Sequence, residues 1–172
     1  MEKIKSYLIG KIVSSNSKEA YSLNQQRNFG EKIEDKIHYT LPEALFLVEE
    51  RKMDIYSKNK QLTKEELKKY LEKFDKKFWI KYLVFKDLRK KGYVVKTALK
   101  FGAEFRVYEK KADIKKTHSK WLVFTESESK KFNWHEFASK NRVAHSTKKN
   151  LLVAIVDEEG SILYYETSWI KP

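Results

Sequence analysis

The chain of 172 residues contains no cysteine, two prolines and five glycines. Without cysteine it can form no disulfide, no iron–sulfur cluster and no Cys-ligated zinc site. The scarcity of glycine leaves no Gly-rich phosphate loop, so a Walker or Rossmann nucleotide site is not expected. No apolar run approaches the roughly 20 residues that cross a bilayer. The first residues, MEKIKSYLIGKIV, lack the apolar core and cleavage site of a signal peptide, so we expect a cytoplasmic protein.

Metal-ligand patterns are also lacking. Of the four histidines, His135 is followed by Glu136 as in a zincin motif, but position 139 is Ser where the second histidine belongs. The triplet from Glu109 to Lys111 has the Glu-x-Lys spacing of a metal-dependent nuclease, yet such triplets arise by chance in a lysine-rich chain. We expect no metal and no cofactor.

Positive charge is abundant. Lys and Arg number 37 against 24 for Asp and Glu, which gives a net charge of +13 and a sequence pI near 9.6. Such a surface attracts polyanions, of which nucleic acid is the usual one. A Lys/Glu-rich thermophile surface is the alternative that composition alone also fits.

The N-terminal part predicts a mixed domain. Residues 3–13 alternate like one strand or a strand pair turning at Gly10, and residues 14–39 suggest short strands and loops. The capping boxes Thr40-Leu-Pro-Glu43 and Thr63-Lys-Glu-Glu66 each predict the start of a helix. A third, longer helix carries Phe78, Tyr82, Phe85 and Leu88 and stops at Gly92.

After Gly92 the pattern becomes that of strands. A short helix capped by Asn133 should bury Trp134 and Phe137, and Arg142-Val143 should begin another strand. The other predicted strands are 93–95, 100–108, 121–124, 151–156 and 162–165. We therefore predict an α+β N-terminal domain (1–75) and an α/β C-terminal domain (76–172) with a mixed central sheet flanked by helices.

Three residues of the second domain are candidates for chemistry. Phe105 and Val107 alternate onto one face of their strand, so Tyr108 falls on the other face. His118 lies three residues before a buried strand, and Lys149 lies just before the most apolar strand in the chain. Taken singly, each is more often an ordinary surface or structural residue.

Together these residues resemble a known family. YLVFKDLRKKGYVVKT (82–97), KFGAEFRVY (100–108), THS (117–119) and RVAHSTKK (142–149) are similar to motifs of the archaeal tRNA-splicing endonucleases (tRNA-intron endonucleases). The resemblance is strong over residues 82–165 and softer before them. Ala98 and Glu104 depart mildly from the glycine and aspartate of the family pattern.

The resemblance implies a function and a site. The family cuts precursor tRNA at bulge–helix–bulge splice sites without a metal, leaving 2′,3′-cyclic phosphate and 5′-hydroxyl ends. Its catalytic tyrosine, histidine and lysine fall on Tyr108, His118 and Lys149, with Lys148 and His145 as neighbouring alternatives. Arg142 matches the arginine that stacks on a bulge base, Tyr164 or Trp169 supplies an opposing flat face, and Ser119 is a further candidate for RNA binding.

The resemblance also implies assembly. Chains of this length are similar to the homotetrameric type, and Asp157-Glu158-Glu159 looks like the acidic loop that docks into a neighbouring subunit. A non-catalytic subunit of the same family and a metal-dependent DNA nuclease on a similar fold are the competing interpretations.

Overall fold

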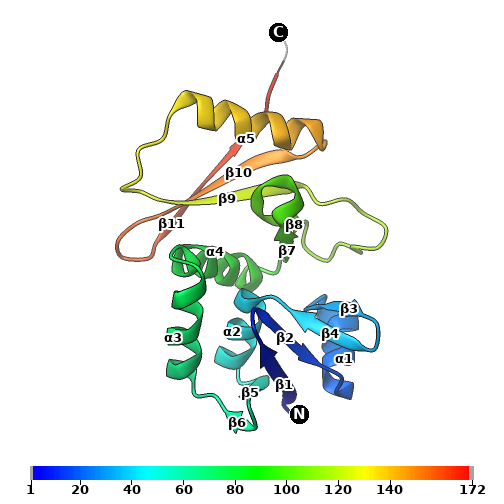
Figure 1. Ribbon diagram of the computed structural model, residues 1–172. Coiled ribbons are helices and arrows are strands. Elements are labelled where there is room, and N and C mark those ends of the chain that lie inside the picture. The colour runs from blue at the N-terminus through cyan, green and yellow to red at the C-terminus, as the bar shows by residue number, and fades with distance from the viewer. Residues whose placement is uncertain (1, 171–172) are drawn as a thin grey trace. The chain divides into compact units, whose positions relative to one another are not determined.

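The computed structural model describes residues 2–170, and the chain divides into two compact units, Met1–Trp79 and Ile80–Pro172. Each unit combines helices with one mixed sheet (Figure 1). The predicted fold class, an α+β domain followed by an α/β nuclease-like domain, is confirmed.

The sheet of the first unit has the strand order β3-β4-β2-β1-β5-β6. Strand β1 turns into β2 at Gly10, whose φ of 57° lies in the left-handed region, so residues 3–13 form a strand pair. β1 alternates strictly between buried and exposed residues, so one face of this sheet packs inward and the other is open. The strands are β1 (Ile4–Ile9), β2 (Ile12–Ser15), β3 (Glu31–Ile33), β4 (Lys36–Tyr39), β5 (Met53–Ser57) and β6 (Lys60–Gln61).

Two of the three helices of this unit begin at the predicted capping boxes. In α2 (Leu41–Glu49) and α3 (Lys64–Phe74) the reciprocal bonds of Thr40 with Glu43 and of Thr63 with Glu66 are both present. The third, α1 (Lys18–Arg27), lies within residues 14–39, where only short strands and loops were expected; the prediction is right for β3 and β4 and wrong for α1. Only two apolar residues of α1 are buried, and its apolar residues form almost no stripe along one face, so the hydrophobic periodicity of the sequence did not indicate a helix.

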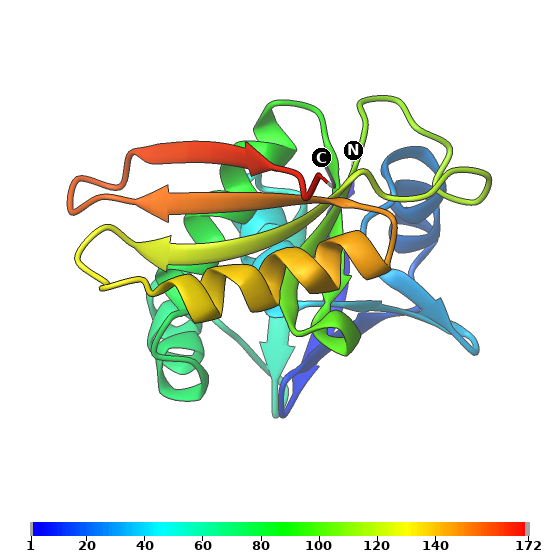
Figure 2. The same cartoon turned by 90° about the horizontal axis from the view of Figure 1, so that it is seen from above.

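The sheet of the second unit has the order β11-β10-β9-β8-β7. β10 runs parallel to β9, and every other neighbouring pair is antiparallel. Helices α4 (Phe78–Lys90) and α5 (Trp134–Ser146) lie on opposite faces of this sheet (Figures 1 and 2). The strands are β7 (Val94–Ala98), β8 (Ala103–Tyr108), β9 (Trp121–Ser127), β10 (Asn150–Val156) and β11 (Ile162–Thr167), with a 3-10 turn at Leu99–Phe101.

Both faces of the central strands are covered. Leu122, Phe124, Leu151 and Val153 pack with Ala144 of α5, whereas Phe105 on the opposite face meets Phe85 of α4, with ring centroids 5.9 Å apart. Six of the seven residues of β9 are therefore buried, as expected for a strand between two helical layers.

Helix α5 is longer than predicted. Its N-cap is Asn133 as expected, but it runs to Ser146, so the strand predicted at Arg142-Val143 is wrong. Trp134, predicted to be buried, is 85% exposed. The β-branched Val143 favoured a strand, but its neighbour Ala144 packs into the core on the helical face, and this tertiary contact decides the local conformation.

Candidate active site

Three adjacent strands bring the candidate residues to one end of the second sheet. Tyr108 is the last residue of β8, and Lys149 immediately precedes β10. Lys120, between them, donates its backbone N–H to the carbonyl of Val107 (2.9 Å) and accepts from the N–H of Asn150 (3.0 Å). Tyr108, Lys120 and Lys149 thus form one row across the three strands.

Tyr108 lies on the face covered by α5. In the register, Arg106 pairs with Leu122, which belongs to the cluster packed against that helix. Two residues further along the same strand, Tyr108 points to the same side. Its side chain is 6% exposed, so the ring is held firmly at the end of the sheet.

His118 lies in the connection between β8 and β9, two residues before Lys120, and is exposed. The preceding segment is folded on Asp113, whose carbonyl accepts the Thr117 N–H (2.9 Å) and the Thr117 hydroxyl (2.8 Å). Ser119, beside the histidine, is only 5% exposed. This burial anchors the segment from which the His118 imidazole reaches solvent, whereas contact of Ser119 with RNA stays a prediction.

Lys149 is positioned by the end of α5. Lys148 adopts a left-handed conformation (φ 55°), and the Lys149 N–H donates to the carbonyl of Ala144 (2.9 Å), which ends the helix and directs the chain into β10. The Lys149 ammonium donates to the carbonyl of Thr147 (2.8 Å). Partial burial first, and then the charges of Arg106 and Lys100, hold the pKa of Lys149 below its ordinary value.

The surroundings of Lys149 were not identified from the sequence. The ammonium groups of Lys100 and Lys149 lie 5.1 and 5.8 Å from the centroid of the Phe101 ring. With Arg106, whose charge also acts on Lys149, they make a group of three cations. Lys100 and Arg106 fall within the motif 100–108, but nothing in their spacing signals that they approach Lys149, more than 40 residues later.

Arg142 and Trp169 lie beside this end of the sheet. Arg142 is exposed on α5, one turn before His145, whose ring meets Trp169 edge-on with centroids 4.5 Å apart. Trp169 is 55% exposed just after β11, where Thr167 pairs with Leu151. An exposed arginine and an exposed indole are thus gathered around His145.

Tyr164 lies on the opposite face from Arg142. It pairs with Ala154, and its hydroxyl donates to Asp87 of α4 (2.7 Å). Burial, followed by this bond to the carboxylate, raises the pKa of Tyr164 well above its ordinary value. Of the two aromatic residues considered as partners for Arg142, Trp169 is the one on its side of the sheet.

The acidic residues 157–159 form the turn between β10 and β11. Asp157 accepts the N–H of Ser161 (2.7 Å), so this carboxylate shapes the turn. Glu158 and Glu159 are exposed at the tip. The two glutamates are therefore the members of the acidic turn that are free to meet another surface.

Within residues 2–170 no helix is long and apolar enough to span a membrane, and no three His, Asp or Glu side chains are grouped as metal ligands.

Comparison with known proteins matches both units. Residues 78–164 match the family described as tRNA intron endonuclease, catalytic C-terminal domain, and residues 4–68 match tRNA intron endonuclease, N-terminal domain. A Pyrococcus abyssi protein named tRNA-splicing endonuclease is 42% identical over 169 residues, 98% of this chain and 97% of that protein. A Nanoarchaeum equitans protein of the same name is 44% identical over 146 residues, 81% of this chain and 93% of that protein.

Proposed function

The chain belongs to the family of tRNA-splicing endonucleases, and we propose that it cuts precursor tRNA at bulge–helix–bulge splice sites, without a metal. Membership of this family supports cleavage of tRNA introns as the activity of this chain. The products are a 2′,3′-cyclic phosphate and a 5′-hydroxyl. Because precursor tRNA is made in the cytoplasm of archaea, from which the similar proteins come, we place the reaction there.

The nucleophile belongs to the substrate. The ribose 2′-oxygen attacks the adjacent phosphorus, a P–O bond to the 2′-oxygen forms, and the bond to the 5′-oxygen breaks. The protein must remove the 2′-hydroxyl proton, deliver a proton to the leaving 5′-oxygen and stabilise the negative charge that gathers on the phosphate. A substrate without a 2′-hydroxyl cannot react, so DNA is not cut.

Tyr108 is the base and His118 the acid. Tyr108 takes the role of base because it matches the catalytic tyrosine of the family and lies in the same row across three strands as Lys149. The exposed position of His118 suits proton delivery to a leaving group that arrives from solvent.

Lys149 stabilises the phosphate. Its ammonium belongs to a group with Lys100 and Arg106, which increases the attraction for a phosphate dianion in the transition state. The carbonyl of Thr147 holds its position through the 2.8 Å bond. This group of cations around Lys149 is the observation that carries the proposed chemistry.

Arg142 and Trp169 grip an unpaired bulge base. A guanidinium and an indole both present flat faces on which a splayed base can stack. The edge-on contact of His145 with Trp169 holds the indole in place.

A substrate with two bulges needs two sites and this chain carries one, so at least two copies must assemble. The resemblance to the short, homotetrameric chains of the family favours four copies, two catalytic and two mainly structural. Glu158 and Glu159 would dock into a basic surface of another copy, because their charge complements the net +13 of the chain.

Cleavage of a bulge–helix–bulge RNA in excess EDTA tests the function. We expect unchanged cleavage for wild type and a loss of roughly 10²–10⁴-fold for His118→Ala, with RNA binding retained. His135→Ala is the matched control, because His135 is exposed in the first turn of α5. Activity that returns only with magnesium would contradict the mechanism, and wild type that binds without cutting would indicate a non-catalytic subunit.

A further inference from the structure

The open face of the N-terminal sheet carries a pair of tyrosines on adjacent strands, of which Tyr7 is exposed and Tyr56 is half-buried. Tyr7 of β1 pairs in register with Tyr56 of β5, and their ring centroids lie 6.1 Å apart at an interplanar angle of 40°. Tyr7 is 42% exposed although it lies in the middle of the sheet. Because β1 buries its alternate residues, the Tyr7 ring belongs to the solvent side and not to the core.

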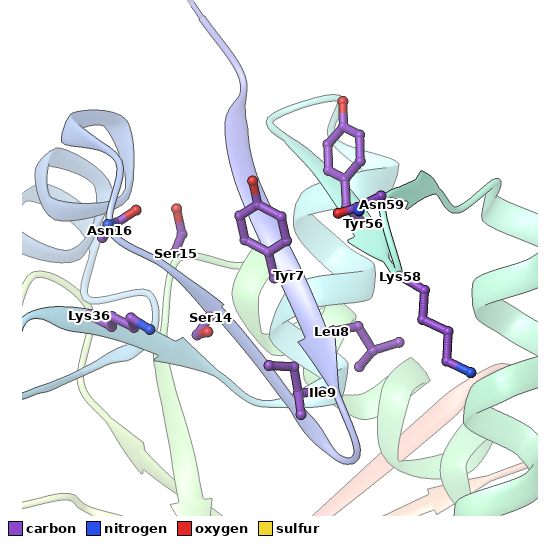
Figure 3. A pocket seen from close by; sticks show the side chains of 10 residues that line it. All are labelled: Tyr7, Leu8, Ile9, Ser14, Ser15, Asn16, Lys36, Tyr56, Lys58 and Asn59. Atoms are coloured by element: carbon purple, nitrogen blue, oxygen red, sulfur yellow. The ribbon is translucent and has the colours of Figure 1, made fainter.

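Unpaired lysines surround the two rings. The Lys5 ammonium lies 5.2 Å from the centroid of Tyr56 and 5.9 Å from that of Tyr7. Figure 3 shows Lys36 and Lys58 on either side of Tyr7. None of these three lysines forms an ion pair with a carboxylate among residues 2–170. Asp54, on the same face, is already paired with Lys3 at 3.0 Å.

The rings border a cavity of about 320 Å³ with polar groups at its edge. Asn16, Ser14 and Asn59 line it and carry amides and a hydroxyl that can hydrogen-bond a base edge. Lys58 and Asn59 both have positive φ (46° and 65°) in the two-residue turn between β5 and β6, a tight hairpin that fixes where they project.

We propose that this face, the tyrosine–lysine face (Lys5, Tyr7, Lys36, Tyr56, Lys58), binds unpaired nucleotides of RNA. Exposed aromatic rings on a sheet stack bases, and lysines without counter-charges contact the phosphates between them. The inference rests on the proposed function, because the unpaired parts of a precursor tRNA are the occupant. All five residues belong to the first unit, whereas the candidate catalytic residues belong to the second.

Fluorescence anisotropy with the full-length chain and a labelled single-stranded oligoadenylate of about 12 nucleotides tests the proposal. Replacing Tyr7 and Tyr56 together by Leu should weaken binding at least about tenfold, because base–aromatic stacking is lost. Replacing both by Phe should keep binding within about threefold. Neither hydroxyl makes a hydrogen bond within residues 2–170, so the Phe variant keeps the stacking surface and the fold.

The lysines have a separate readout. Changing Lys5, Lys36 and Lys58 to Gln should reduce the slope of log affinity against log salt by about 2, since each single-strand phosphate contact contributes about 0.7. Lys69→Gln is the matched control, because Lys69 is exposed on α3 away from these strands. Cleavage of a minimal bulge–helix–bulge RNA without other unpaired segments should stay at the wild-type rate in all variants.

The outcomes separate this inference from the proposed function. Wild-type cleavage with oligoadenylate binding unchanged by the Leu and Gln variants overturns the inference and leaves the function standing. If oligoadenylate binding depends on the two tyrosines but the wild-type chain cuts no RNA, the binding role of the tyrosine–lysine face is supported and the proposed endonuclease function is refuted. Leu variants that change the sedimenting mass while binding is unchanged would assign the face to contacts between copies, and would overturn the proposal.

Discussion

Replacing Lys149 by methionine keeps most of the apolar stem of the side chain and removes its charge. If the ammonium stabilises the phosphate in the transition state, cleavage should slow by about 10²–10³-fold, the usual cost of one such donor. Stability should change little. Loss of the hydrogen bond to the Thr147 carbonyl should lower the free energy of unfolding by about 0.5–1.5 kcal/mol. Relief of the repulsion from Arg106 and Lys100 at this partly exposed site should raise it by about 0.2–1 kcal/mol.

The pH dependence of stability gives a second signature of Lys149. Its pKa is lowered in the folded chain, so between that pKa and about 10.4, the value of a lysine in water, the unfolded chain binds more protons than the folded chain. The stability of wild type should therefore rise with pH across this window. The Lys149→Met variant should lack this rise.

Single-turnover cleavage and urea unfolding at several pH values measure both effects. Lys148→Met is the matched control, since Lys148 is exposed, adjacent and the other lysine of the motif. The reasoning is refuted if Lys149→Met cuts within tenfold of wild type while Lys148→Met does not, or if Lys149→Met loses more than about 2 kcal/mol of stability.

Three further predictions concern other parts of the second unit. Changing Glu158 and Glu159 to Ser, while keeping Asp157 because it shapes the turn, should shift a tetramer towards dimers in sedimentation. A variant that stays tetrameric and active would show that the acidic turn takes no part in assembly. Asn133→Ala should cost about 1 kcal/mol in urea unfolding, because the N-cap of α5 is lost, while the cleavage rate is retained. Burial raises the pKa of Glu104, so the folded chain binds its proton more tightly than the unfolded chain, and the free energy of unfolding should fall as pH rises above about 4.3. Glu104→Gln should remove this fall; equal slopes of unfolding free energy against pH in wild type and variant would disprove it.

Local chemistry made several elements predictable. A capping box is closed by groups three residues apart, so the starts of α2 and α3 could be predicted from a few residues each. The sequence also indicated that Tyr108 faces away from Phe105 and Val107, because alternation along one strand needs no knowledge of its neighbours. The family motifs identified the candidate tyrosine, histidine and lysine in the same way, by spacing along the chain.

Contacts between distant segments decided the rest. Helix α1 and the second half of α5 have weak local signals, and the packing of residues such as Ala144 against the sheet determines what they become. Lys100 and Arg106 come near Lys149 only because β8, β9 and β10 are neighbours in one sheet. Tyr7 and Tyr56 likewise meet because β5 runs parallel to β1, a pairing between segments far apart in sequence. Spacing along the chain thus determined which residues are candidates, whereas strand pairing decided which charges and rings surround them.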